Sequence, residues 1–269
     1  MPRTFLITGA SSGIGAQFAR AYARRGADLV LVARRLDRLK NLAEELATAH
    51  GVKVTCLDAD LGKRDQVKHL LERLKHHNLV IDGLINNAGY SLARTFPNTT
   101  ADQQLDFVEV CVSTPTLLAH ELLGHMITQG YGRIINVSSM VAFSPGASGH
   151  TLYPAAKAYM LKFSRSLAAE VADKGVHVTA LCPGATESEF MTSNGMNAML
   201  DKPDSHGPGR FTMSAESVVE AAIRANEKGR EVVITGFVNQ FAVALMTYVP
   251  DFIITPLIRW GAKKYQLED

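Results

Sequence analysis

The sequence lacks several features that would assign it to a specialised class of protein. Its three cysteines, Cys56, Cys111 and Cys182, lie far apart and mostly within apolar runs, so we expect reduced core thiols and no disulfide framework. Lysine and arginine form no run longer than a pair and are not interleaved with aromatic residues, which argues against a nucleic-acid partner. Strand-like sequence starts at Thr4 and leaves no room for a signal peptide, so we expect a cytoplasmic protein.

Charge is missing from residues 232–250, a stretch of 19 residues that approaches the length of a membrane span. The stretch contains Gly236, Asn239 and Gln240, and its first residues are typical of a short strand. A membrane span is therefore not predicted. Repeats, low-complexity tracts and linkers are also missing, so the sequence predicts one domain over residues 1–269.

Short β-branched runs alternate along the chain with longer helical patterns, which is typical of an α/β protein with a parallel sheet and crossover helices. The predicted strands are residues 4–7, 29–32, 52–57, 79–85, 134–137, 176–181 and 232–235. Long helices are predicted at residues 101–129 and 152–174, and the first of these contains Pro115, so we expect a break or kink in its middle.

The first strand runs into glycines at positions 9, 13 and 15. A strand that turns sharply into a helix aims backbone N–H groups and the positive end of the helix dipole at one point, where a phosphate fits. Gly9 would make the turn, Gly13 would allow the diphosphate to approach, and Gly15 would let the helix lie close to the strand. The spacing differs from the commoner Gly-x-Gly-x-x-Gly, and an ordinary glycine-rich turn is the alternative.

Several polar residues follow predicted strands or begin the next helix. Tyr153 and Lys157 lie four residues apart and share one helix face, where an ammonium would lower the pKa of the phenol and let it exchange a proton. The same spacing is also common between surface residues of a helix that have no functional role. Ser138 and Ser139 could bind a substrate carbonyl oxygen or only satisfy backbone groups. Asp60 could accept a hydrogen bond from an adenine amino group or cap the next helix.

In this order, these residues resemble those of an NAD(P)-dependent short-chain dehydrogenase/reductase. The motifs are Thr8-Gly9-x-x-x-Gly13-x-Gly15, Asp60-Leu61, Asn86-Asn87-Ala88-Gly89, Ser138-Ser139, Tyr153-x-x-x-Lys157 and Pro183-Gly184, and they span residues 4 to 235. The resemblance implies a single Rossmann-type, doubly wound, mostly parallel sheet of seven strands with helices on both faces. It also implies hydride transfer between a nicotinamide and a carbonyl or alcohol carbon.

The resemblance also implies roles for individual residues. Tyr153 would be the acid/base, Lys157 would hold the nicotinamide ribose and lower the tyrosine pKa, and Ser139 would polarise the carbonyl. Ser138 stays an alternative to Ser139, because the loop before Tyr153 is a residue longer than usual. No metal is expected. The residues implied in cofactor binding are Gly9, Ser11, Ser12, Gly13, Ile14, Gly15, Arg34, Arg35, Asp60, Leu61, Asn87, Ala88, Gly89, Tyr153, Lys157, Pro183, Gly184 and Ser188.

The coenzyme is predicted from the end of the second strand. An acidic residue there would bind the ribose hydroxyls of NAD, but this chain has Arg34 and Arg35. A guanidinium pairs with a 2′-phosphate, so the sequence predicts NADP(H). The alternative is that both arginines are surface residues at the start of a helix.

Position 111 departs from the family pattern, because many members have asparagine where this chain has Cys111. In the family, the main-chain carbonyl of that asparagine holds a water that links the catalytic lysine to solvent. A thiol does not reproduce the hydrogen bonds of an amide, so we expect a working enzyme with a slower proton relay.

The substrate is predicted only as a class. Residues 186–213 fall where the family places its substrate lid, and they carry the apolar residues Phe190, Met191, Met196, Met199 and Phe211. Methionines adapt to irregular apolar shapes, which favours a steroid-, retinoid- or fatty-acyl-like ketone or alcohol, although core packing would explain them equally.

The apolar C-terminal extension, residues 237–269, places Phe237, Phe241, Leu245 and Tyr248 on one helical face. This face could close the pocket, pack on a second subunit or rest on a membrane surface, and we prefer these in that order. The family resemblance favours a homodimer or homotetramer formed through the helices at 101–129 and 152–174.

Two other functions are compatible with parts of the pattern. The first is a non-catalytic dinucleotide sensor with decayed chemistry at Cys111, which the intact Ser139, Tyr153 and Lys157 disfavour. The second is an epimerase or dehydratase that shares the tyrosine–lysine pair, but such relatives usually have a longer substrate domain and the other glycine spacing.

Overall fold

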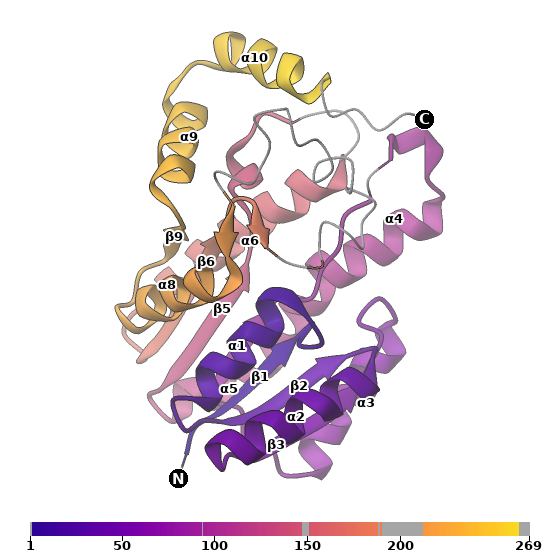
Figure 1. The fold of residues 1–269 in the computed structure, drawn as a ribbon, viewed down its shortest axis with the longest axis vertical. Helices are drawn as coiled ribbons and strands as arrows, with labels where there is room; N and C mark the ends of the chain where they lie inside the picture. The colour runs from indigo at the N-terminus through magenta and orange to yellow at the C-terminus, as the bar shows by residue number, and fades with distance from the viewer. Residues whose placement is uncertain (1, 93, 147–150, 188, 190–211, 264–269) are drawn as a thin grey trace.

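The computed structural model describes residues 2–92, 94–146, 151–187, 189 and 212–263 (Figure 1). The main strands are β1 (Thr4–Thr8), β2 (Asp28–Ala33), β3 (Val54–Asp58), β4 (Gly83–Asn86), β5 (Gly132–Val137), β6 (Val176–Cys182) and β9 (Val232–Ile234). The helices are α1 (Gly13–Ala23), α2 (Leu36–His50), α3 (Arg64–His76), α4 (Ala101–Val108), α5 (Thr114–Thr128), α6 (Leu152–Glu170), α8 (Ala215–Glu227), α9 (Phe237–Tyr248) and α10 (Asp251–Lys263).

The main strands form one seven-stranded parallel sheet in the order β3-β2-β1-β4-β5-β6-β9. From β1 the chain adds β2 and β3 on one side and then returns to add β4 on the other side. The carboxyl ends of β1 and β4 are therefore the expected ligand site of a doubly wound fold. The predicted Rossmann-type architecture is confirmed. Its strands are buried on both faces, which explains why they were recognisable as short, nearly continuous apolar runs.

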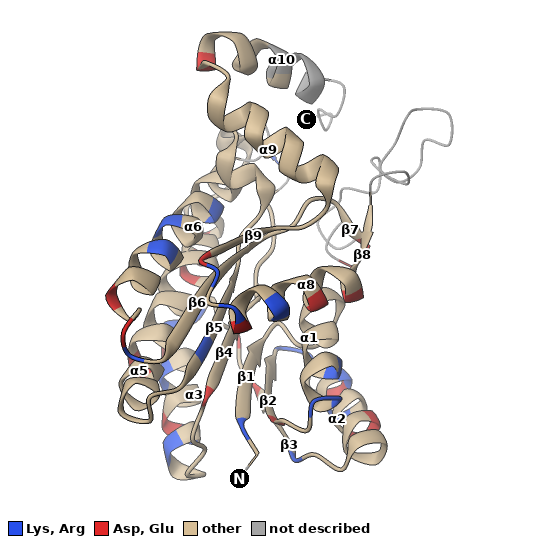
Figure 2. Cartoon of the chain, turned by 90° about the vertical axis from the view of Figure 1, so that its left-hand side faces the viewer, with Lys and Arg blue, Asp and Glu red and all other residues tan. Residues whose placement is uncertain are grey.

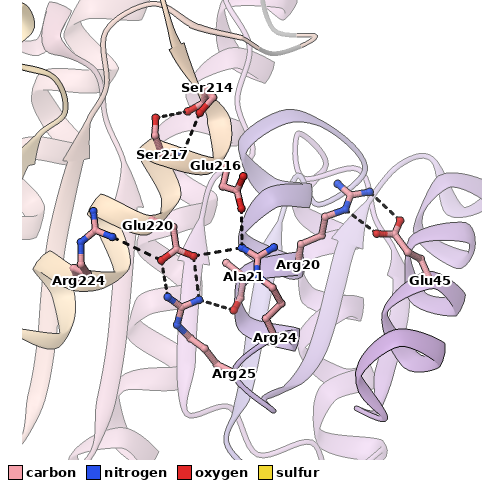
Figure 3. A network of polar contacts seen from close by, with 10 residues as sticks. All are labelled: Arg20, Ala21, Arg24, Arg25, Glu45, Ser214, Glu216, Ser217, Glu220 and Arg224. Atoms are coloured by element: carbon pink, nitrogen blue, oxygen red, sulfur yellow. Dashed lines mark hydrogen bonds and ion pairs between the residues drawn. The ribbon is translucent and has the colours of Figure 1, made fainter.

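Successive side chains of β1 enter two separate apolar layers. Phe5 and Ile7 pack with α1, α2 and α8 on one face, while Leu6 packs with α3, α5 and α6 on the other. Exposed ion pairs join the end of α1 to α8 at the surface of the first layer, for example Arg25 Nη2 to Glu220 Oε2 at 2.6 Å (Figure 3). Because exposed pairs contribute about 0–1 kcal/mol each, the two buried layers carry the stability of the fold.

Three predicted element boundaries need correction. The strand predicted at residues 79–85 begins only at Gly83, because Asn78 adopts a left-handed turn (φ 51°) after α3 and residues 79–82 return the chain to the sheet. The strand predicted from residue 52 begins at Val54, and the helix predicted to residue 174 ends at Glu170. Apolar residues continue beyond the regular element in each case, so composition alone overextends it.

The break predicted at Pro115 is confirmed. A π-helical turn at Glu109–Ser113 separates α4 from α5, and Pro115 is the second residue of α5. Proline has no N–H to offer the Cys111 carbonyl four residues earlier, so a regular α-helix cannot continue through this point.

A small second sheet was not predicted. It pairs β7 (Thr186–Glu187) with β8 (Met213–Ser214), at the two ends of the region predicted as a lid. Two-residue strands are too short to show a period-two pattern. The lid's own apolar residues, Phe190, Met191, Met196, Met199 and Phe211, lie outside the described residues, as does Ser188.

The C-terminal extension forms α9 and α10 at the end of the molecule opposite the N-terminus (Figures 1 and 2). They contain 12 and 13 residues. Within the described part of the chain, every helix is too short or too polar to cross a membrane.

Candidate active site

The glycine turn lies between β1 and α1 and is clamped from β4. Gly9 and Gly13 have positive φ angles of 65° and 54°, which favour glycine. The side-chain amide of Asn87 donates to the carbonyl oxygens of Thr8 and Gly9 at 2.9 and 3.3 Å. A Cβ on Gly15 would lie 2.3 Å from the Gly9 oxygen. The turn is therefore fixed by close backbone packing, and the Asn87 amide acts as its support.

Thr8 is a second support that the sequence analysis missed. Its hydroxyl donates to the Ile85 carbonyl and accepts from the backbone N–H groups of Asn87 and Ala88, at distances of 3.2, 2.9 and 3.0 Å. The hydroxyl is almost fully buried. Thr8 thus ties the end of β1 to the Asn87–Ala88 segment, and its position directly before Gly9 was the only available signal.

The two predicted arginines have different surroundings. Arg35 Nη2 lies 3.0 Å from the hydroxyl oxygens of both Ser11 and Ser12, so its guanidinium covers the glycine turn. Arg35 and Arg38 also bind Glu189, with closest contacts of 3.3 and 2.8 Å. The Arg38 and Glu189 contacts join residues 151 positions apart and had no signal in the sequence.

Arg34 has different surroundings from Arg35. It is exposed, and no ion pair joins it to another described residue. Its charge instead lowers the pKa of Tyr90, although burial outweighs this and raises that pKa to about 12. Arg35 is thus the arginine already held over the turn.

The other predicted cofactor residues line the carboxyl edge of the sheet. Asp60 Oδ1 accepts from the Gly62 N–H at 3.0 Å, a local turn contact. Leu61 is buried, and its carbonyl accepts from the Thr114 hydroxyl at 2.9 Å. Ile14 is the second residue of α1 and packs against the core. These contacts position the backbone and leave the adenine role of Asp60 as a prediction.

Pro183 and Gly184 follow β6 at the same edge. The Pro183 carbonyl accepts from the Met140 N–H at 3.0 Å, which joins this loop to the 3₁₀ turn Met140–Phe143 after β5. A Cβ on Gly184 would lie 2.4 Å from the Asn239 side chain. The residue is therefore glycine because α9 approaches it closely.

Lys157 lies on α6 and is almost fully buried. Its Nζ donates to the Val137 carbonyl at 2.8 Å and lies 5.5 Å from the centre of the Tyr153 ring. Ser138 donates to the Lys157 backbone carbonyl at 2.7 Å, which ties β5 to α6. The structure thus brings the lysine and the tyrosine together and gives Ser138 a supporting contact.

Ser139 is the serine that lies close enough to Tyr153, the predicted acid, for its hydroxyl to act on the pKa of that phenol, which it lowers. Its backbone is extended, and its hydroxyl oxygen accepts from the Val141 N–H at 3.3 Å at the start of the 3₁₀ turn. The choice of Ser139 over Ser138 as the candidate catalytic serine is supported by this contact.

Burial dominates the electrostatics of the pair. Burial raises the pKa of Tyr153, and the Ser139 hydrogen bond offsets this only in part. Burial also lowers the pKa of Lys157. The lowering of the tyrosine pKa by Lys157 stays a prediction, since in this structure desolvation of Tyr153 dominates and the Lys157 Nζ donates to the Val137 carbonyl. Tyr153 therefore keeps its proton at neutral pH.

Cys111 lies in the π-helical turn beside Lys157. Its thiol is buried. Burial raises the pKa of the thiol more than the neighbouring Tyr90 backbone lowers it. A cavity of about 10 Å³ is lined by side chains that include Lys157, Cys111 and Thr114. Its polar lining and size suit about one water. Cys111, the residue that departs from the family pattern, thus lies beside Lys157, where the predicted proton relay would run.

We predict that Cys111→Asn raises turnover several-fold. The amide would offer a donor and an acceptor beside the Lys157 cavity, where the thiol offers only weak ones. Steady-state kcat across pH measures the effect, and Cys111→Ala is the control because it adds no hydrogen-bonding group. Unchanged turnover and an unchanged pH profile in Cys111→Asn would show that this position does not limit the relay.

The fold and the glycine turn together define a dinucleotide-binding oxidoreductase class. The family described as short chain dehydrogenase matches residues 3–198. A short chain dehydrogenase of Pseudocercospora fijiensis (strain CIRAD86) is 39% identical over 192 residues, and the match covers 70% of this chain and 61% of that relative. The chain belongs to the short-chain dehydrogenase/reductase family, as its motifs indicated.

Two solved structures cover nearly the whole chain. A short-chain dehydrogenase from Sphingobium yanoikuyae in complex with NADPH has a TM-score of 0.79 and 33% identity, over 93% of this chain and 97% of that one. A bulky-bulky ketone specific alcohol dehydrogenase from Comamonas testosteroni has a TM-score of 0.75 and 32% identity, over 93% and 95%. The predicted class of enzyme is confirmed, and the non-catalytic alternative gains no support.

Proposed function

We propose that this protein is an NADP(H)-dependent oxidoreductase that transfers a hydride between the nicotinamide and the carbonyl or secondary alcohol carbon of an apolar substrate. The observation that carries the proposal is the position of Tyr153 beside the buried Lys157, whose Nζ lies 5.5 Å from the centre of the tyrosine ring. The pair supplies a protonated acid next to a buried cation, at the carboxyl edge of the sheet. This is the arrangement that reduction of a carbonyl needs.

The residues present fit NADP(H). The glycine turn is held by close packing, because a Cβ at Gly9 or Gly15 would collide with the Asn87 side chain, and a fixed turn at the start of a helix suits a diphosphate. Arg35 covers the turn together with the hydroxyls of Ser11 and Ser12, which suits the extra 2′-phosphate of NADP. The NADPH complex of the Sphingobium yanoikuyae relative agrees with this assignment.

Each catalytic residue has a separate task in the proposed reaction. When bound, the cofactor supplies or accepts the hydride. Ser139 donates a hydrogen bond to the substrate oxygen, and Tyr153 delivers its proton to that oxygen as reduction proceeds. Lys157 holds the ribose hydroxyls, and the Val137 carbonyl fixes the position of its Nζ. Oxidation of an alcohol reverses these steps.

An apolar substrate is supported by the surroundings of Tyr153. The tyrosine packs with a cluster formed by Phe107, Cys111 and Ala156, against which Tyr90 and Leu92 also pack. The partly exposed members, Tyr90 and Leu92, place apolar surface beside Tyr153, which suits a substrate with bulky carbon groups. The Comamonas testosteroni relative is named for bulky ketones, which agrees with this choice. Steroid-, retinoid- and fatty-acyl-like compounds remain the proposed substrates.

The proposal is tested by following absorbance of NADPH with a panel of steroid, retinoid and fatty-acyl carbonyls, and of NADP with the matching alcohols. We expect turnover of at least one bulky apolar compound and less with small polar ketones. NADPH binding without turnover of any compound would favour the dinucleotide sensor and overturn the proposal.

Arg35 should decide the coenzyme. We predict that Arg35→Ala raises the KM for NADPH about 10- to 100-fold, the loss expected for a charge-assisted contact, with little change for NADH. Arg34→Ala should have a smaller effect, since Arg34 is not held over the turn. Arg20→Ala, which removes an exposed arginine paired with Glu45, is the control. An equal loss for NADH and NADPH would contradict a 2′-phosphate contact.

The assembly and its location are further parts of the proposal. We propose a homodimer or homotetramer of single-domain chains that pair through α4, α5 and α6, which is supported by the exposed apolar residues Leu105, Ile127 and Tyr159 on these helices. We also propose a cytoplasmic location, which agrees with the free thiols of Cys56, Cys111 and Cys182.

A further inference from the structure

Helix α9 carries its apolar side chains outward. Phe237, Phe241 and Tyr248 are 82%, 61% and 84% exposed, while Asn239 and Val243 are the buried residues of this helix. A surface helix of a globular protein normally shows the opposite arrangement, with its apolar stripe against the core. The outward face of α9 therefore has no covering within the described part of the chain.

Three polar side chains of α9 donate hydrogen bonds to backbone carbonyls. Asn239 donates to the Thr235 carbonyl at 2.7 Å, Gln240 to the Ile234 carbonyl at 3.0 Å, and the Thr247 hydroxyl to the Val243 carbonyl at 2.8 Å. No residue of α9 is charged. Removing water from such a helix costs less than it would for a charged one, because no ionised side chain has to be desolvated.

The exposed face continues into α10. Phe252 and Ile253 are 78% and 46% exposed at its start, and Ile254 is the buried residue beside them. We define the apolar end as Phe237, Val238, Phe241, Leu245, Tyr248 and Phe252, all of them exposed. Residues 232–263 contain only three charged residues, Asp251, Arg259 and Lys263. Figure 2 shows the contrast with α2, α6 and α8, whose ribbons carry several charged positions.

The apolar end is fixed next to the active site. Asn239 meets Gly184 in the loop after β6, and α9 packs against the 3₁₀ turn that follows Ser139. Figures 1 and 2 both place α9 and α10 beyond this edge of the sheet, at the end of the molecule. The apolar end is therefore anchored beside the candidate site.

We propose that the apolar end docks on a lipid bilayer, with α9 and the start of α10 inserted at the level of the headgroups. The 12-residue α9 is too short to span a hydrocarbon core of about 30 Å, so it would lie in the interface. Exposed phenylalanine and tyrosine without charge match this region. The structure thus favours the membrane surface, the least preferred of the three alternatives, over pocket closure, because Phe237, Phe241 and Tyr248 are exposed while Asn239 is the residue that meets the loop after β6.

A bilayer fits better than a second copy of this chain. A bilayer receives the uncharged helix α9 without a matching surface, whereas a protein interface needs a complementary surface and usually has a polar rim. The docking is independent of the proposed reaction. It would bring the edge that carries Ser139 and Tyr153 close to the lipid.

The test uses the full chain with NADPH bound and follows flotation with phosphatidylcholine vesicles, with and without phosphatidylglycerol. We expect the protein to float with both kinds of vesicle. Trp260, the single tryptophan of the sequence, belongs to the same C-terminal extension. We expect its fluorescence to shift to shorter wavelength on vesicle addition and to be quenched by brominated lipid.

Variants separate the bilayer from other occupants. Phe237→Ser with Phe241→Ser should lower the vesicle-bound fraction at least about tenfold while turnover of a water-soluble substrate is kept. Val80→Ser with Phe96→Ser, which removes two exposed apolar residues elsewhere, should bind vesicles like the parent. Absence of flotation overturns the proposal, and a dimer in sedimentation equilibrium that Phe237→Ser with Phe241→Ser dissolves would assign the face to a second copy instead.

Discussion

Replacing Tyr153 with phenylalanine should lower kcat about 10²- to 10⁴-fold, the range expected when a general acid is removed. Phenylalanine keeps the ring that packs against Phe107 and Ala156 but has no proton to give to the substrate oxygen. The binding of NADPH should change little, since the glycine turn and Arg35 are untouched. Stopped-flow or steady-state reduction of the best panel substrate measures the loss.

The pH dependence gives an independent check of the same residue. Because burial raises the pKa of Tyr153, the phenol is protonated at neutral pH. Reduction, which needs the protonated phenol, should be constant from neutral to mildly alkaline pH and fall only as the pH rises through the raised pKa. Oxidation needs the phenolate, so its rate should increase as the pH rises towards the raised pKa. A reduction rate that falls between pH 6 and 8 would contradict Tyr153 as the acid.

A matched variant distinguishes chemistry from structure. Tyr159→Phe removes another tyrosine hydroxyl from the same helix, one bonded to Thr116 at 2.9 Å, and should leave kcat unchanged. If Tyr159→Phe and Tyr153→Phe lose activity equally, the loss comes from α6 and not from proton transfer. If Tyr153→Phe retains full turnover, the assigned role is wrong.

The fold was predictable because its strands are buried on both faces. Runs such as 29–32 in β2 pair with neighbours on each side and stay apolar along their length, so their type and order could be predicted from the sequence. The candidate site residues were predictable for a related reason. They follow strands, and the carboxyl ends of parallel strands meet at one edge.

What could not be predicted depends on distances between side chains. The spacing of Tyr153 and Lys157 indicates a shared helix face but not that the Val137 carbonyl takes the ammonium, nor that burial sets the tyrosine pKa. The meeting of Arg38 with Glu189 is equally invisible in the sequence. Long-range side-chain contacts leave no periodic pattern.

The direction of α9 is a further example. Its spacing shows an apolar face, and the usual expectation is that such a face is buried. Asn239 reverses this, because it packs against Gly184 and bonds to the Thr235 carbonyl on the inner side. The opposite side, with Phe237 and Phe241, is then turned outward. The contacts of Asn239 thus indicate which side of α9 faces the protein.

Replacing Gly15 with alanine should weaken NADPH binding more than tenfold and destabilise the protein. The new Cβ would lie 2.3 Å from the Gly9 carbonyl oxygen and 2.6 Å from Asn87 Nδ2. The oxygen cannot move away freely, because the Asn87 amide holds it and Gly9 already has a left-handed φ of 65°. Overpacking of this kind costs about 1–3 kcal/mol, and the displaced turn no longer presents its N–H groups to a diphosphate.

Gly124→Ala is the matched control for this substitution. Gly124 lies within α5, and a Cβ there meets no atom of the structure within 4 Å. Alanine is better than glycine inside a helix by about 0.5–1 kcal/mol, so this variant should be slightly more stable and bind NADPH like the parent. Denaturant unfolding and cofactor titration measure both effects. If Gly15→Ala matches Gly124→Ala in stability and NADPH affinity, the turn is not held rigid by the Gly9–Asn87 contact, and the phosphate cradle assigned to it is wrong.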